Sequence, residues 1–210
     1  MQYLVKLFIL FLGCIGLPAH AEKPFDYYVL SLSWSPEFCA IKPEDRQCGR
    51  GYGIVLHGLW PQYDKGYPQN CGFERLSKTL VNRYRDLYPS PKLLFHEWNK
   101  HGSCSALPPA DYLELSRTLK DNFKTPAALQ VLSQPLRVTA VQLKQHIIAA
   151  NPKLTTDALA FACTGGGRFL QEIYICFDQT GATATTCSAE VQKRSQKSCG
   201  QSDFLMRNVR

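Results

Sequence analysis

The chain has 210 residues, a formal net charge of +7 and nine cysteines. No internal repeat, linker or low-complexity tract divides it, which excludes a repeat array and favours one compact domain. The positive charge is compatible with a polyanionic partner. It is equally typical of a soluble surface, because the charges are scattered and become dense only at Lys193, Arg194 and Lys197.

Residues 1–21 have the pattern of a signal peptide. Lys6 precedes an apolar run over residues 7–17, and residues 19–21 (AHA) form a small-x-small cleavage site. The apolar run is too short for a membrane span. We therefore expect the segment to be cleaved after Ala21.

The remaining residues 22–210 are expected to form a single domain that is periplasmic or secreted, monomeric and free of the membrane. For the N-terminal segment, the alternative to cleavage after Ala21 is a lipoprotein signal that ends at Cys14. Phe11, three residues before this cysteine, is unfavourable for such a signal, and the better cleavage site lies downstream.

Apolar periodicity predicts three strands. Residues 28–34 alternate as one buried strand face, residues 53–57 form a short strand, and residues 169–177 alternate again. The three glycines at 165–167 predict a hairpin turn before the last strand.

Helical spacing marks the middle of the chain. Apolar residues recur every four positions over residues 76–88, and residues 112–123 form an amphipathic pattern. Thr139 and Gln142 form a capping box that opens another helix, which stops by Asn151. Strands near both ends with helices between them predict an α+β fold with a central, mainly antiparallel sheet and packed helices.

Two short motifs contain three of the five histidines: residues 57–62 (HGLWPQ) and residues 96–104 (HEWNKHGSC). The second motif overlaps a predicted helix over residues 91–101, with Ser90 as its N-cap and a proline in its first position. At about 100° per residue, one face of this helix carries four ionisable side chains: His96, Glu97, Lys100 and His101.

These residue types suit the cleavage of RNA by its own 2'-hydroxyl. That reaction needs a base for the hydroxyl proton, an acid for the leaving 5'-oxygen and positive charge beside the phosphorus. Imidazoles titrate near neutrality and can supply both the base and the acid. A zinc site is the alternative, but zinc-binding helices space two histidines four apart, whereas His96 and His101 are five apart. We therefore expect no metal and no other cofactor.

Both motifs resemble the active-site motifs of the ribonuclease T2 family, the secreted acid ribonucleases of fungi, plants and bacteria. Residues 25–36 (FDYYVLSLSWSP), followed by Cys39, are similar to the opening strand of that family, and the late cysteines also fit. The similarity extends from Phe25 to about Gly200. It implies a T2-like catalytic domain over residues 22–210 with the same α+β architecture.

The resemblance implies a role for five side chains. At the matching positions, His57 and His101 are the acid and base pair, with His101 as the base in the first step. His96 binds phosphate, and Glu97 with Lys100 stabilises the pentacovalent phosphorus. The implied activity is metal-independent endonucleolytic cleavage of single-stranded RNA to a 2',3'-cyclic phosphate and then a 3'-phosphate. DNA lacks the nucleophile and should not be a substrate.

Base recognition is expected just after His57. Trp60 is predicted to lie on the turn that leaves the strand, where it either stacks on an unpaired base or fills the core. In the family, the position of Gln62 helps to choose the base, and an amide can donate or accept, so base preference stays open. Tyr63 and Tyr67 are candidates for a second wall.

Cysteine usage agrees with export. Apart from Cys14, an even number remains, which predicts four disulfides, although the count alone leaves the pairing open. No Cys-x-x-Cys occurs, which disfavours metal binding. The resemblance implies two pairs, and two further pairs complete the expected set: Cys71–Cys104 and Cys163–Cys199, then Cys39–Cys48 and Cys176–Cys187.

Two other function classes stay open. A secreted, disulfide-rich binding protein could keep the fold without the chemistry, although the complete set of five polar side chains argues against this reading. A hydrolase with a serine or cysteine nucleophile is the other. The chain lacks a Gly-x-Ser-x-Gly motif, and its remaining cysteines are expected in disulfides.

Overall fold

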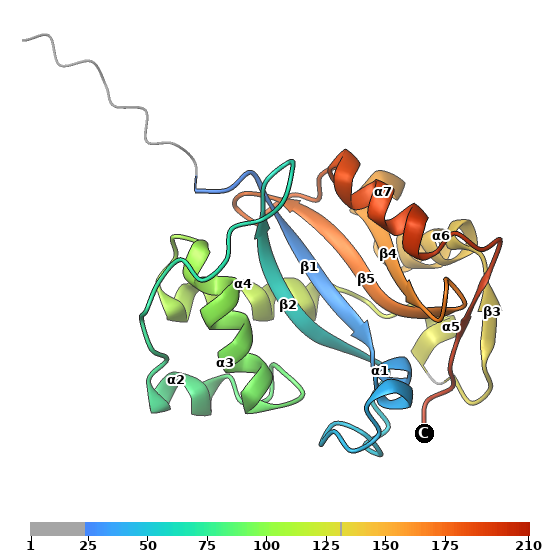
Figure 1. The fold of residues 1–210 in the computed structure, drawn as a ribbon, viewed down its shortest axis with the longest axis horizontal. Helices are drawn as coiled ribbons and strands as arrows, with labels where there is room; N and C mark the ends of the chain where they lie inside the picture. Colours follow the sequence, from blue (N-terminus) through green and yellow to red (C-terminus); the bar gives the residue numbers. More distant parts are fainter. Residues whose placement is uncertain (1–23, 131) are drawn as a thin grey trace, which may run out of the picture.

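The computed structural model describes residues 24–130 and 132–210, so the predicted signal peptide and Cys14 lie outside the described residues. The described part contains one six-stranded sheet with helices around it (Figure 1). The strands are β1 (Tyr27–Trp34), β2 (Ile54–Gln62), β3 (Leu136–Val138), β4 (Leu159–Thr164), β5 (Phe169–Asp178) and β6 (Phe204–Met206). Within these residues, no helix is both long and apolar enough to cross a bilayer.

Strands β1 and β5 form the centre of the sheet. β1 pairs antiparallel with β2 on one side and with β5 on the other, and β5 also pairs antiparallel with β4. The order β2-β1-β5-β6-β3 places β2 at an edge, and the short contact of β5 with β6 is parallel. The predicted α+β fold with a mainly antiparallel sheet is therefore confirmed.

The helices lie around this sheet, with α3 and α4 against β2 and α7 along β4 (Figure 1). The capping box predicted at Thr139 and Gln142 opens α6. The helices are α1 (Ser35–Ile41), α2 (Lys78–Arg83), α3 (Pro91–Lys100), α4 (Pro109–Asn122), α5 (Ala127–Gln130), α6 (Ala140–Ala150) and α7 (Ala189–Ser198), with short 3-10 turns η1 (Gly102–Cys104) and η2 (Thr156–Ala158).

The helix predicted over residues 76–88 is shorter than its apolar spacing indicates. Only α2 is helical, because Tyr84 leaves the helical region at its C-cap and turns follow. Tyr84 and Tyr88 are nevertheless 1% and 3% exposed. Packing of these two rings into the core therefore requires the chain to turn inward, and tertiary contacts override the helical periodicity.

Strand β2 is longer than predicted and corrects the expected turn at Trp60. It continues through Pro61 to Gln62 and pairs with β1 along this whole stretch. Proline has no N–H to donate, but an edge strand tolerates it because one of its sides has no neighbouring strand to pair with. The register passes from Ser31 opposite Gly58 to Leu32 opposite Leu56, which makes His57 the extra residue of a β-bulge.

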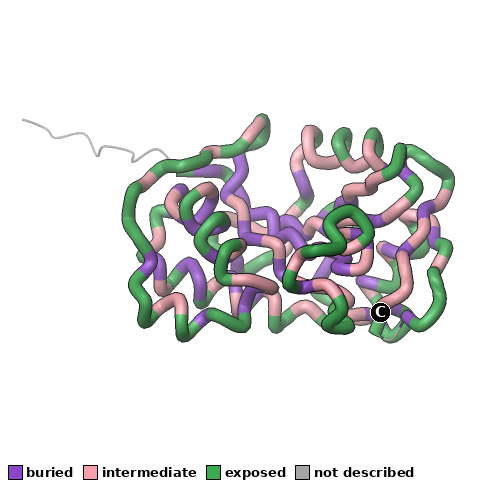
Figure 2. The backbone as a smooth tube through the Cα atoms, turned by 60° about the horizontal axis from the view of Figure 1, so that its bottom comes forward, coloured by how far each residue is buried: buried purple, intermediate pink, exposed green. Residues whose placement is uncertain are grey.

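The core lies on both faces of β1, whose residues are all buried. One face carries the side chains predicted from residues 28–34, and they join the larger core beneath α3 and α4. The other face carries Tyr27 and Val29, which pack with Cys176 and, at the margin, Trp60 and Tyr174. Figure 2 shows the buried segments running through the middle of the molecule, where the strands lie.

The described residues contain four disulfides, and these are the four expected pairs: Cys39–Cys48, Cys71–Cys104, Cys163–Cys199 and Cys176–Cys187. The Cys71–Cys104 bond joins the loop after β2 to the turn that follows α3. It therefore holds the two histidine motifs close together.

Candidate active site

Both histidine motifs line one cavity of about 340 Å³. Strand β2 contributes His57, Trp60 and Gln62, and α3 with its C-cap contributes His96, Glu97, Lys100 and His101. Helix α7 forms a further wall. All five side chains expected to act on phosphate thus face the same space.

The bulge in β2 sets the direction of His57. The following residue, Gly58, lies so close to α3 that a Cβ atom there would collide with the Glu97 carboxylate and the Trp60 indole. Only glycine therefore allows the edge strand to approach α3 at this point. The imidazole remains reachable, with 33% of the side chain exposed.

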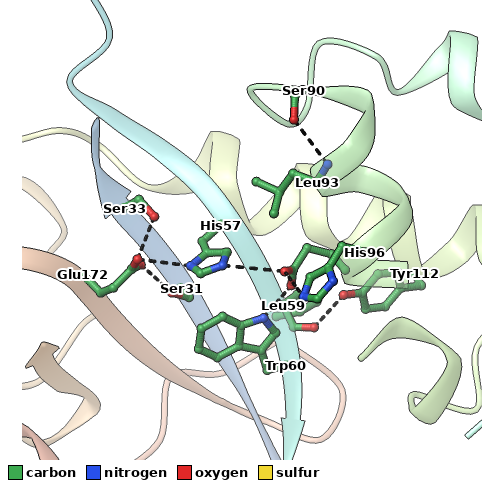
Figure 3. Close-up of polar contacts among 11 residues, drawn as sticks. Ser31, Ser33, His57, Leu59, Trp60, Ser90, Leu93, His96, Tyr112 and Glu172 are labelled. Atoms are coloured by element: carbon green, nitrogen blue, oxygen red, sulfur yellow. Dashed lines mark hydrogen bonds and ion pairs between the residues drawn. The ribbon is translucent and has the colours of Figure 1, made fainter. Parts of the chain in front are cut away.

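A carboxylate absent from the sequence-based prediction contacts His57 (Figure 3). His57 Nδ1 donates to Glu172 Oε1 at 3.1 Å, and Glu172 also accepts from Ser31 and Ser33, both at 2.8 Å. Glu172 lies in the predicted late strand but is only 6% exposed. The available signal was a charged residue in the middle of a mostly apolar strand. This signal does not identify a partner 115 positions away.

Helix α3 arranges the second motif. It starts where predicted, because Ser90 accepts from Leu93 N and Pro91 occupies the first turn (Figure 3). It ends one residue earlier than predicted, since His101 is the C-cap and η1 follows. A Cβ at Gly102 would collide with the rings of Trp98 and Tyr112, so close packing requires glycine here.

Glu97 lines the cavity and is 1% exposed. Its Oε2 accepts from Trp60 Nε1 at 2.6 Å, and its Oε1 lies 3.7 Å from His57 Nε2 and 4.0 Å from His96 Nε2. Among the described residues, Oε1 has no hydrogen-bond partner. Burial raises the pKa of Glu97 to about 7, although His57, Trp60 and Lys100 oppose this rise.

The two imidazoles of the expected acid and base pair have opposite pKa shifts. Burial lowers the pKa of His101 to about 3, and the nearby charges of Lys100, His96 and His57 act in the same direction. Burial also acts to lower the pKa of His57, but the hydrogen bond and charge of Glu172, with the charge of Glu97, raise it above its ordinary value.

The Trp60 ring packs against both of these imidazole rings. Its ring centroid lies 5.1 Å from that of His57 and 5.2 Å from that of His101, and 5.9 Å from that of Tyr174. It therefore lies at the cavity wall, packed on one side and open on the other, and it also holds Glu97 in place.

The other residues expected at a base site lie in different places. Gln62 lines the cavity but is 7% exposed, and its amide donates to Pro61 O. Tyr63 is exposed and is not among the residues that line the cavity, so its contact with substrate stays a prediction. Tyr67 does line the cavity, with its ring 5.8 Å from that of His101. Tyr63 and Tyr67 are exposed to a similar extent, at 39% and 37%, and a turn between Tyr63 and Gly66 separates them.

Helix α7 supplies a cationic wall that the sequence indicated only as a local density of charge. Arg194 lines the cavity and pairs with Glu190 one turn earlier. Glu190 also accepts from Gly66 N, which ties α7 to the loop that carries Tyr67. Ser195 accepts from Phe161 N and so fixes α7 to β4.

Metal ligands do not gather in the described part of the chain. Within residues 24–130 and 132–210, no group of three or more His, Cys, Asp and Glu side chains has the arrangement to hold a metal ion. The cationic groups that face the cavity are the ammonium of Lys100, the guanidinium of Arg194 and the histidines when protonated.

Comparison with protein families and curated proteins gives consistent similarities. A model of the ribonuclease T2 family matches residues 25–187. A ribonuclease of Aeromonas hydrophila is 46% identical over 191 residues, which cover 89% of this chain and 87% of that protein. A probable ribonuclease of Haemophilus influenzae is 35% identical, over 76% of this chain and 60% of that protein.

Solved structures share the fold. A variant of RNase MC1 in complex with 5'-UMP superposes with a TM-score of 0.68 at 22% identity, covering 86% of this chain and 97% of that chain. RNase NT in complex with 5'-AMP has a TM-score of 0.59 at 24% identity, with 78% and 91% covered.

Proposed function

Because this chain belongs to the ribonuclease T2 family, we propose that it is an endoribonuclease that cleaves single-stranded RNA through a 2',3'-cyclic phosphate. The observation that carries this proposal is a single cavity in which two imidazoles with opposite pKa shifts face the same space as Lys100. Such a pair supplies a neutral base and a charged acid at the same pH.

In the first step, neutral His101 accepts the proton of the ribose 2'-hydroxyl, and the oxygen attacks the adjacent phosphorus. Protonated His57 gives its Nε2 proton to the departing 5'-oxygen as the P–O5' bond breaks. The products are a 2',3'-cyclic phosphate and a free 5'-hydroxyl. In the second step the roles exchange, because His57 now deprotonates water and His101 protonates the 2'-oxygen, which leaves a 3'-phosphate.

Lys100 supplies positive charge beside the crowded phosphorus. His96 adds charge only when it is protonated, because burial and the charges of Lys100 and His57 lower its pKa. Glu97 contributes differently, because its raised pKa of about 7 leaves it protonated at mildly acidic pH. Its Oε2 already accepts from Trp60, so the proton belongs on Oε1, the oxygen nearest His57 and His96. A neutral carboxyl group there donates a hydrogen bond to a phosphate oxygen without adding negative charge.

For base binding, we propose that Trp60 and Tyr67 flank an unpaired base, with Gln62 at its edge. Both rings line the cavity next to His101. Stacking on aromatic rings tolerates every base. The Gln62 amide donates one N–H to Pro61 O, which leaves its second N–H and its carbonyl oxygen for the edge of a base.

The test is cleavage of purified RNA at mildly acidic pH, compared between the wild type, His101→Ala and the matched control His146→Ala. His146 is exposed on α6 and does not line the cavity. We expect acid-soluble nucleotides from the wild type and the control, in excess chelator as well, and no cleavage of DNA. RNA that stays intact with the wild type would instead support a binding protein on this fold.

The four disulfides also favour an oxidising compartment, which agrees with a periplasmic or secreted protein. We propose a monomeric domain that begins near residue 22. Cell fractionation and light scattering of the purified protein test these two points.

A further inference from the structure

The Glu172 carboxylate lies at the centre of the sheet. It projects from β5 on the cavity side and is 6% exposed. Burying a carboxylate costs several kcal/mol unless hydrogen bonds compensate, so a structure that needed only packing would place an apolar side chain here. Three side chains donate to it: Ser31 to Oε2, and Ser33 and His57 to Oε1.

The sheet is built to hold these groups. Ser33 lies directly opposite Glu172 in the pairing of β1 with β5, and Ser31 lies two residues away on the same face. Both serines are buried, at 7% and 0% exposed, in a strand whose other residues on that face are Tyr27 and Val29. The two hydroxyls thus interrupt an apolar face at the point where the carboxylate needs donors.

From this position Glu172 reaches across β1 to β2, where the bulge presents His57 (Figure 3). A carboxylate only accepts hydrogen bonds, so His57 Nδ1 must carry a proton. In the neutral ring, Nε2 is then the free acceptor, and in the charged ring it carries the transferable proton. In both cases Nε2 faces the cavity, 3.7 Å from Glu97 Oε1.

We infer that Glu172 is a positioning residue for His57: it fixes the tautomer and the plane of the ring so that Nε2 delivers its proton to the leaving oxygen, and its charge favours the protonated ring. This inference deepens the proposed function and rests on it. The alternative is that Glu172 only connects three strands and contributes to stability.

Other titratable groups also face His57, and their contributions must be separated from that of Glu172. They are Glu97, Lys100, His96 and His101 from α3 and its C-cap, Tyr174 from β5, and Arg194 from α7, which lines the same cavity. Glu172→Gln leaves these side chains in place, but it also removes a charge that raises the pKa of Glu97 and of Tyr174. The tautomer of His57, observed directly, is therefore the selective measurement.

The primary experiment is nuclear magnetic resonance of the His57 ring in the wild type, which depends neither on a variant that folds nor on RNA. We expect the Nδ1–H tautomer when the ring is neutral. A neutral ring protonated on Nε2 would overturn the inference while leaving the proposed ribonuclease activity intact.

The second experiment compares Glu172→Gln with the control Glu37→Gln. Glu37 is also buried and accepts from two side chains, Thr164 and Arg207, but it does not line the cavity. For Glu172→Gln we expect kcat to fall about 10- to 100-fold with KM within about twofold, and the alkaline limb of kcat/KM to move to lower pH.

For Glu37→Gln we expect lower thermal stability but an unchanged kcat, pH profile and His57 titration. If Glu172→Gln keeps the wild-type kcat and pH profile while RNA cleavage by the wild type is robust, Glu172 has only a structural role. If the wild type cleaves no RNA but His57 has the expected tautomer, the proposed function fails and the contact with Glu172 stands.

Discussion

His57 and His101 line the same cavity but have opposite electrostatic surroundings. His57 sits on a bulge of an edge strand, partly exposed, with a carboxylate on its Nδ1. His101 caps α3, is 5% exposed, and its Nδ1 has no hydrogen-bond partner among the described residues. The protonated imidazole is therefore favoured at His57 and disfavoured at His101.

This difference supports the proposed acid and base roles, because the opposite pKa shifts follow from where each imidazole lies in the fold. An imidazole without a partner in a buried site loses its proton readily, and the neighbouring Lys100 strengthens that effect. The partly exposed imidazole beside Glu172 keeps its proton to higher pH. Two side chains of the same type therefore differ in protonation before substrate binds, as the proposed acid and base roles require.

The largest expected effect tests whether His57 is the acid and His101 is the base. His57→Ala and His101→Ala should each lower kcat on RNA by about 10²- to 10⁴-fold. On an aryl ester of a nucleoside 3'-phosphate, the leaving group needs no proton. His57→Ala should then regain most of its activity and His101→Ala should not. Recovery of His101→Ala in place of His57→Ala would show that the two roles are exchanged.

The pH dependence should be bell-shaped. kcat/KM should rise as pH passes about 3, where His101 becomes neutral, and fall above pH 6.5, because the acid His57 has a pKa raised from that ordinary value. Loss of the Glu97 proton near 7 adds to the fall. Initial rates from pH 3 to 9 measure this profile, and a monotonic rise into alkaline pH contradicts it.

Glu97 extends the comparison to stability. Its folded pKa of about 7 lies above the unfolded value of 4.5, so its contribution is fully present below pH 4.5 and is lost as pH rises through 7. At pH 8, Glu97→Gln should therefore have a free energy of unfolding about 1–3 kcal/mol higher than the wild type. It should also unfold at a higher temperature. At pH 4 the two should be alike, and thermal melts at both values test this.

The smallest expected effect concerns α7, the wall opposite α3. Arg194→Ala should raise KM about 2- to 5-fold with little change in kcat, and should weaken the salt dependence of kcat/KM by about one phosphate contact. The matched control is Arg137→Ala, which removes an arginine also paired with an acid, Asp203, but remote from the cavity. Equal effects of the two variants would exclude a specific contact with RNA.

The sequence by itself determined those features that depend on neighbouring residues. Ser90 and Pro91 specify where α3 starts, Thr139 and Gln142 open α6, and alternation places one face of β1 in the core. Caps and periodic faces involve residues only a few positions apart, so local chemistry suffices to predict them. The two histidine motifs likewise contain, within a few positions, the residue types that predict cleavage of RNA.

Only the tertiary structure decided how distant segments meet. The bond between His57 and Glu172 depends on the register of three strands and on one bulge, and the continuation of β2 past Pro61 depends on its being an edge strand. The place of Tyr67 in the cavity lining depends on a loop that Glu190 of α7 holds through Gly66 N. Register, edges and loop closure are properties of the assembled sheet, because they arise only when segments far apart in sequence pack together.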